Sequence, residues 1–122
     1  MAWQIRKDRI ETLTRALRFK LPVTVLRAKV LAPNPEAAGL MTTVPTRHVI
    51  VLRDELPAHR ANLALCHEFI HCMQRERLGP RLDAEYLFAE AQHGYDDNPY
   101  EQDARNRGLH LSLKLPLVEE VA

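Results

Sequence analysis

The segment that decides the fold covers residues 59–80 and reads HRANLALCHEFIHCMQRERLGP. Its apolar side chains recur every three or four residues, which predicts a helix with one buried face. The closing Gly-Pro pair is a helix stop signal, so we expect the helix to run from about His59 to Leu78. The four positions predicted for the buried face are Leu63, Cys66, Ile70 and Met73.

The residues before this helix predict a small sheet and one more helix. Three short runs rich in Val, Ile, Leu and Thr are separated by Pro, Asn and Gly, as strands are. Ahead of them, Asp8–Lys20 repeats apolar residues at helical spacing and is closed by a proline, so we expect an amphipathic helix there. Ala32–Pro35 has the composition of a linker. The predicted strands are Val23–Val30, Gly39–Val44 and His48–Arg53.

Two further helices are expected after the Gly-Pro stop. Asp83 is a good N-cap for a helix to about Gln92, and Leu82 and Leu87 occupy the positions of a hydrophobic staple. Asn98-Pro99-Tyr100-Glu101 offers an N-cap, a first-turn Pro and an acid, opening a last helix to about Gly108. No assignment is made for residues 109–122. The fold class is therefore α+β: a small three-stranded mixed or antiparallel sheet packed on the N-terminal helix and the HRANLALCHEFIHCMQRERL helix, with two further C-terminal helices.

Composition limits the classes of protein to consider. The chain has 122 residues, 46% hydrophobic and 27% charged, which fits a single domain over residues 1–122. The formal charge of +1 and the scattered arginines give no reason to expect nucleic acid or membrane as a partner.

Cys66 and Cys72 are six residues apart in one helix, too far for a disulfide. Unpaired thiols and a charged N-terminus without a signal peptide favour the cytoplasm.

Inside the long helix stands His67-Glu68-Phe69-Ile70-His71, an HExxH motif. Histidines four residues apart project from one helix face, so both imidazoles can reach one metal ion at about 2.0 to 2.1 Å. Glu68 lies further round the helix, where a carboxylate can take a proton from a water on that ion. The spacing predicts a zinc site with His67 and His71 as ligands and Glu68 as the catalytic base.

From His48 to Gly108 the chain resembles the zincin metallopeptidases, specifically small gluzincin-like ones whose zinc site is completed by a glutamate from a downstream helix. Asn98-Pro99-Tyr100-Glu101-Gln102-Asp103-Ala104 is similar to the NPYExEA-type segment of small bacterial and phage-encoded metallopeptidases. The resemblance implies a minimal zincin-like fold, one Zn²⁺ per chain and Glu101 as the third ligand. It also implies that Arg47–Arg53 is a sheet edge that pairs with an extended peptide substrate.

The chain departs from the larger gluzincins, which carry an Asp four residues after the ligand glutamate to orient a zinc histidine. Position 105 is Arg, so the residue that orients the histidines is open. Asp103 is a candidate for that role, or for the ligand itself. Glu101 has a competing interpretation, because Asn98 and Glu101 satisfy a capping box without any metal. His93 and Glu90 are the other rivals for the third ligand.

The candidates to stabilise an oxyanion are Tyr95, Tyr100 and His93, because gluzincin-like enzymes use a Tyr or a His for that task.

The sequence supports two hypotheses for function. The first is a zinc-dependent peptidase or amidase acting on an extended peptide or protein, with a larger assembly as one source of specificity in so short a chain. The second is a non-catalytic structural or protein-binding module, in which the same zinc, or none, only ties the long helix to the last one. A structural zinc would take a fourth ligand from His93 or Asp103.

Overall fold

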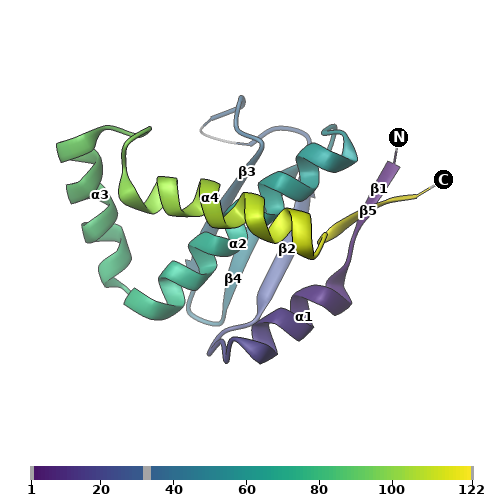
Figure 1. Cartoon of the computed structure of the whole chain (residues 1–122), viewed down its shortest axis with the longest axis horizontal. Coiled ribbons are helices and arrows are strands. Elements are labelled where there is room, and N and C mark those ends of the chain that lie inside the picture. Colours follow the sequence, from purple (N-terminus) through teal and green to yellow (C-terminus); the bar gives the residue numbers. More distant parts are fainter. Residues whose placement is uncertain (1, 32–33, 122) are drawn as a thin grey trace.

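A computed structural model describes residues 2–31 and 34–121 and has α+β architecture (Figure 1). Ala32 and Pro33, half of the expected linker, lie outside the described residues. The elements in chain order are β1 (Ala2–Ile5), α1 (Lys7–Ala16), β2 (Val23–Ala28), β3 (Gly39–Val44), β4 (Arg47–Arg53), α2 (Ala58–Leu78), α3 (Arg81–His93), α4 (Pro99–Lys114) and β5 (Val118–Val121).

The three predicted strands form one mixed sheet in the order β2-β4-β3. β2 runs parallel to β4, and β3 runs antiparallel to it through a tight turn. This order corrects one expectation: Arg47–Arg53 was predicted to be a sheet edge, but β4 is the central strand. Its alternate residues His48, Ile50 and Leu52 are fully buried, as a strand paired on both sides allows. The edge strand beside α2 is β3.

Helix α2 is the middle layer of the molecule, between the sheet and α4 (Figure 1). Its buried face carries Leu65, Cys66, Phe69 and Cys72, which pack with the sheet in the main hydrophobic core. Burying a side chain the size of Phe69 contributes about 1.5 to 3 kcal/mol. The predicted core face was wrong at Leu63, which is 43% exposed. The sheet packs instead on the side of the helix that carries Leu65 and Phe69.

Both cysteines are free and buried, which confirms that they form no disulfide. Burial raises the pKa of the Cys66 thiol to about 12 and raises that of Cys72 as well. These thiols therefore stay protonated and act as small apolar core residues.

The first helix is shorter than predicted. α1 ends at Ala16, and Arg18 adopts a left-handed conformation with φ of 57°. This turn brings Phe19 onto the core, where its ring stacks on Phe69 with centroids 5.4 Å apart. The local pattern could not show that Phe19 packs better outside the helix than within it.

Strands β1 and β5, which the sequence did not predict, pair antiparallel from Ala2 with Val121 to Ile5 with Val118. Trp3 anchors this ribbon: it is 3% exposed, and its Nε1 donates a hydrogen bond of 2.7 Å to the carbonyl of Leu56. The two ends of the described chain therefore lie side by side (Figure 1).

Both C-terminal helices exist, with corrected boundaries. α3 begins at Arg81 after Pro80, so Asp83 is not the N-cap and instead pairs with Arg75. Leu87 is 65% exposed and forms no staple with the buried Leu82. α4 continues past Gly108 to Lys114. No helix in the described ranges is long and apolar enough to cross a membrane.

Candidate metal centre

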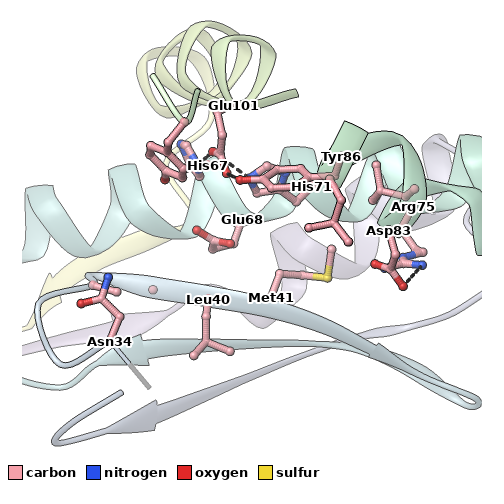
Figure 2. Close-up of a pocket in the computed structure, with 15 residues that line it drawn as sticks. Asn34, Leu40, Met41, His67, Glu68, His71, Arg75, Asp83, Tyr86 and Glu101 are labelled. Atoms are coloured by element: carbon pink, nitrogen blue, oxygen red, sulfur yellow. Dashed lines mark hydrogen bonds and ion pairs between the residues drawn. The ribbon is translucent and has the colours of Figure 1, made fainter. Parts of the chain in front are cut away.

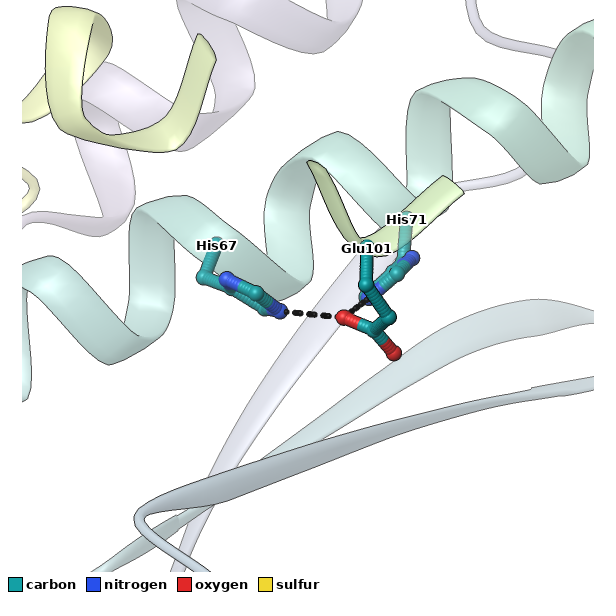
Figure 3. A group of neighbouring side chains, drawn as sticks. All are labelled: His67, His71 and Glu101. Atoms are coloured by element: carbon teal, nitrogen blue, oxygen red, sulfur yellow. Dashed lines mark hydrogen bonds and ion pairs between the residues drawn. The ribbon is translucent and has the colours of Figure 1, made fainter. Parts of the chain in front are cut away.

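Helix α2 presents His67 and His71 on one face, as their spacing predicts. Their imidazole rings lie 5.0 Å apart, and both turn Nε2 toward the start of α4. His71 is buried and His67 is partly exposed, so the pair stands at the inner end of an accessible site. Figure 3 shows the two rings on successive turns of α2, facing Glu101.

Helix α4 delivers Glu101 from its first turn. The helix starts there because the Asn98 side chain accepts a hydrogen bond of 3.0 Å from the Tyr100 N–H, and Pro99 occupies the first helical position. The capping-box interpretation of Glu101 is wrong. Its carboxylate turns away from Asn98 and toward the two histidines of α2.

His67, His71 and Glu101 converge on one point. Glu101 Oε1 accepts hydrogen bonds from His67 Nε2 at 3.0 Å and from His71 Nε2 at 3.2 Å (Figure 3). The three candidate ligand atoms all lie within 4.8 Å of one another, so these residues can hold a metal ion. The three residues are called the metal group below. Two imidazole nitrogens and one carboxylate oxygen are a donor set that suits a divalent transition metal.

The charges of the group are mutually dependent. Burial alone would raise the pKa of the Glu101 carboxyl, but the hydrogen bonds from the two imidazoles and from Tyr86 hold it well below its usual range. Burial alone would lower the pKa of His71, but the hydrogen bond to Glu101 and the nearby Glu68 carboxylate raise it. Glu101 is thus ionised and ready to coordinate, and a metal must displace the proton with which His71 Nε2 bonds it.

Glu68 lines a cavity of about 550 Å³ between α2, β3 and α3. In Figure 2 its side chain points from α2 toward β3, where Leu40 and Met41 lie, while Glu101 lies on the side of α2 that faces away from β3. Burial raises the pKa of the Glu68 carboxyl, and the neighbouring imidazoles only partly offset this. A carboxylate of raised basicity at an accessible cavity suits a proton acceptor.

The cavity continues past the metal group. A second hollow of about 370 Å³ shares Gly39, His67, Glu68 and Tyr95 with the first and extends toward Arg60. Gly39 lets β3 come close to Glu68 here: a Cβ at this position would lie 3.1 Å from Leu52 and 3.4 Å from the Glu68 side chain. Together the two hollows form a groove along the edge strand β3.

The oxyanion candidates have different surroundings. Tyr95 lines both hollows beside Glu68, and burial, followed by the charges of Glu101 and Glu68, raises the pKa of its phenol, so the hydroxyl stays protonated. The Tyr100 hydroxyl instead donates to Glu85 at 3.3 Å. His93 is exposed and lines neither hollow. Tyr95 is therefore the only one of the three candidates that lies at the groove.

The rival ligands lie outside the metal group. Asp103 accepts hydrogen bonds from Arg107 and from Gln74 and does not reach the imidazoles. His93 and Glu90 are not part of the group either. The Arg105 side chain donates a hydrogen bond to the carbonyl of Asp96 and does not contact the histidines.

Two residues at the site were missed by the sequence analysis. The Tyr86 hydroxyl donates a short hydrogen bond to Glu101 Oε2, which leaves Oε1 to face the histidines. Gln74 accepts from His71 Nδ1 at 2.8 Å. Neither carries a local signal, because both contacts depend on how α2, α3 and α4 pack together.

Gly108 lets α4 approach the metal group. A Cβ at this position would lie 2.9 Å from the Cα and 3.0 Å from the N of His67. Gly108, predicted to end the helix, instead marks the close crossing of α4 over α2 at a candidate ligand.

We expect Gly108→Ala to destabilise the metal-free protein by about 1 to 3 kcal/mol, as overpacking does. Helix propensity alone would give the opposite sign, about 1 kcal/mol in favour of Ala. Urea unfolding measures the difference, with Asn106→Ala, an exposed position on α4, as the control that should be neutral or stabilising. A more stable Gly108→Ala protein would contradict the close crossing.

The chain was compared with known proteins by sequence and by fold. It matches no protein-family model, no curated protein and no solved structure.

Proposed function

We propose that this protein is a zinc-dependent hydrolase, most plainly a peptidase or amidase, and that its domain is a minimal zincin. The observation that carries the proposal is the meeting of Glu101 Oε1 with Nε2 of both HExxH histidines, beside a groove that Glu68 lines. Two histidines and one glutamate are a donor set of catalytic zinc sites. The mixed sheet, the HExxH helix and the downstream glutamate support the resemblance to zincins.

The number of protein ligands favours catalysis over a structural role. A structural zinc site is filled by four protein ligands, whereas a catalytic one keeps a position for water or substrate. Over residues 2–31 and 34–121, the metal group contains three members and neither His93 nor Asp103 joins it. A non-catalytic zinc module would need a fourth protein ligand, and the described residues supply none at this site.

The residues around the group have distinct roles in the proposed reaction. When bound, zinc supplies Lewis-acid chemistry, polarising a carbonyl and lowering the pKa of a water toward about 7. Glu68 takes the proton of the attacking water on its carboxylate and passes it to the leaving amine. Tyr95, protonated at the groove, donates a hydrogen bond to the oxygen that becomes negative.

The substrate proposed is an extended peptide, and its docking strand is β3 in place of β4. Since the Arg53 N–H bonds the Ala38 carbonyl, alternation along the antiparallel pair turns the backbone groups of Gly39 and Met41 to the open edge. A peptide strand added there would pass along the groove beside Glu68.

The proposal is tested by metal analysis and by cleavage of a mixed peptide library. We expect close to one zinc per chain, cleavage that a chelator stops, and recovery on adding zinc. His67→Ala should lose both the metal and the cleavage, while His59→Ala, at the start of the same helix, should keep both. Zinc-loaded protein that cleaves no peptide would contradict the peptidase proposal, and a parent protein that binds no zinc would overturn the site.

A further inference from the structure

A buried amide lies behind the metal group. Gln74 is on α2, three residues beyond His71, and is 1% exposed. Its Oε1 lies 2.8 Å from His71 Nδ1. Its Nε2 donates to the Tyr100 carbonyl at 2.9 Å and to Asp103 Oδ2 at 3.0 Å. The amide therefore connects a candidate ligand on α2 with the first turn of α4.

The chemistry of these partners fixes which way the amide faces. A carbonyl and a carboxylate can only accept hydrogen bonds, so the NH₂ end of Gln74 must face Tyr100 and Asp103. The oxygen end is then left facing His71. Because an amide oxygen only accepts, Nδ1 of His71 must carry the proton of that hydrogen bond. The other ring nitrogen, Nε2, is the one that points at Glu101 and can coordinate.

We infer that Gln74 is the positioning residue of the metal centre: when Nε2 gives up the proton that it donates to Glu101, Gln74 holds His71 as the Nδ1–H tautomer with Nε2 directed at the ion. The inference rests on the proposed function, since it concerns the same site. Gln74, a neutral amide on the ligand's own helix, thus takes the role of orienting a histidine that Arg105 leaves open. Asp103 acts one step further back, by orienting Gln74.

The same amide also positions the third ligand. Tyr100 and Asp103 are on α4, on either side of Glu101 in the sequence. Asp103 is braced by two hydrogen bonds from Arg107, at 2.7 and 2.8 Å. By bonding both α4 groups, Gln74 fixes the first turn of α4 against the turn of α2 that carries His71. His71 and Glu101 are thus held in register by one side chain.

Two substitutions of Gln74 test the inference, with zinc affinity measured by competition with a chromophoric chelator. Gln74→Met keeps the length of the side chain and removes both the strong acceptor and the donor. Gln74→Glu keeps the shape but turns a carboxylate toward two acceptors. We expect Gln74→Met to bind zinc about 10- to 100-fold more weakly than the parent, the usual cost of losing a partner of a metal ligand. Gln74→Glu still offers His71 an acceptor but repels Asp103 and the Tyr100 carbonyl, so we expect its zinc affinity to fall because the link to α4 is lost.

The matched control is Asn62→Leu. Asn62 is another polar residue of α2 that ties the helix to distant backbone, accepting from the N–H groups of Leu117 and Val118 at 2.7 and 3.1 Å. It belongs to no contact of the metal group. Asn62→Leu should lower the unfolding midpoint and leave zinc affinity unchanged, which separates loss of stability from loss of positioning.

A spectroscopic measurement reports the tautomer directly. In protein loaded with Co²⁺, the ring N–H protons of the ligand histidines give strongly shifted NMR signals, and their exchange with solvent can be timed. The His71 proton, buried against Gln74, should exchange more slowly in the parent than in Gln74→Met. The His67 proton serves as the internal reference and should be unaffected by the substitution.

The outcomes are distinguishable. A parent that binds neither zinc nor cobalt overturns the proposed function and the inference together. A parent that binds zinc, with parental affinity and unchanged His71 exchange in Gln74→Met, overturns the inference alone. Parental affinity in Gln74→Glu overturns the requirement for an amide. Weak binding by both variants, with an intact Asn62→Leu control, supports the positioning role.

Discussion

The Glu101→Gln variant is expected to bind zinc about a hundredfold to ten thousandfold more weakly than the parent. Zinc-binding free energies of about 10 to 16 kcal/mol, spread over three or four ligands, assign roughly 3 to 5 kcal/mol to each. A neutral amide keeps the size of the side chain but is a poor zinc ligand. Chelator competition measures the loss.

The fold of this variant should survive without metal. Asn98 caps Tyr100 with its own side chain, and Glu101 takes no part in that cap. The circular dichroism of metal-free Glu101→Gln should therefore match that of the parent. Glu90→Gln and Asp103→Asn are the controls: the first should leave zinc affinity unchanged, and the second should cost less than Glu101→Gln. Normal zinc affinity in Glu101→Gln would exclude Glu101 as a ligand.

Glu68→Gln should keep one zinc per chain but lose peptide cleavage by about a hundredfold or more, the usual contribution of a positioned general base. An amide cannot accept the proton, while its shape still fits between α2 and β3. The loss should appear in kcat, because Glu68 is proposed to act on the attacking water. Initial rates on the best cleaved library peptide measure it.

The control for Glu68 is Glu55→Gln, which removes a carboxylate that is 76% exposed and lines neither hollow of the groove. It should leave both zinc content and cleavage unchanged. Zinc lost from Glu68→Gln would mean that Glu68 supports the metal group. Equal cleavage rates in Glu68→Gln and the parent would remove it from the reaction.

The parts of the site that could be predicted from the sequence are those set by local geometry. The i, i+4 spacing of His67 and His71 fixes their common face wherever the helix packs. The Asn98-Pro99 start places Glu101 in the first turn of its helix. That the three meet was expected only from the resemblance, because the crossing of α4 over α2 depends on Gly108 and on packing.

The rest depends on contacts between distant segments. A strand's own pattern does not say whether it lies at the centre or the edge of a sheet, and β4 was therefore misplaced. The apolar periodicity of α2 likewise predicted that Leu63 is buried, although the sheet packs on the side of α2 that carries Leu65. Tyr86 and Gln74 carry no sign of their roles in the sequence, where they look like ordinary helix residues. Their contacts with the metal group exist only because α2, α3 and α4 pack together.

The pairing of β1 with β5 has a consequence for the order of folding. Gln4 and Glu119 bond across it although 115 positions separate them in the chain. Closing so long a loop is entropically costly until the intervening chain has collapsed, whereas β3 and β4 close through the two residues at positions 45 and 46. All groups of the metal centre lie between Gly39 and Arg107, inside that loop. We expect the terminal ribbon to form last and to open first, so that its local unfolding leaves the groove assembled.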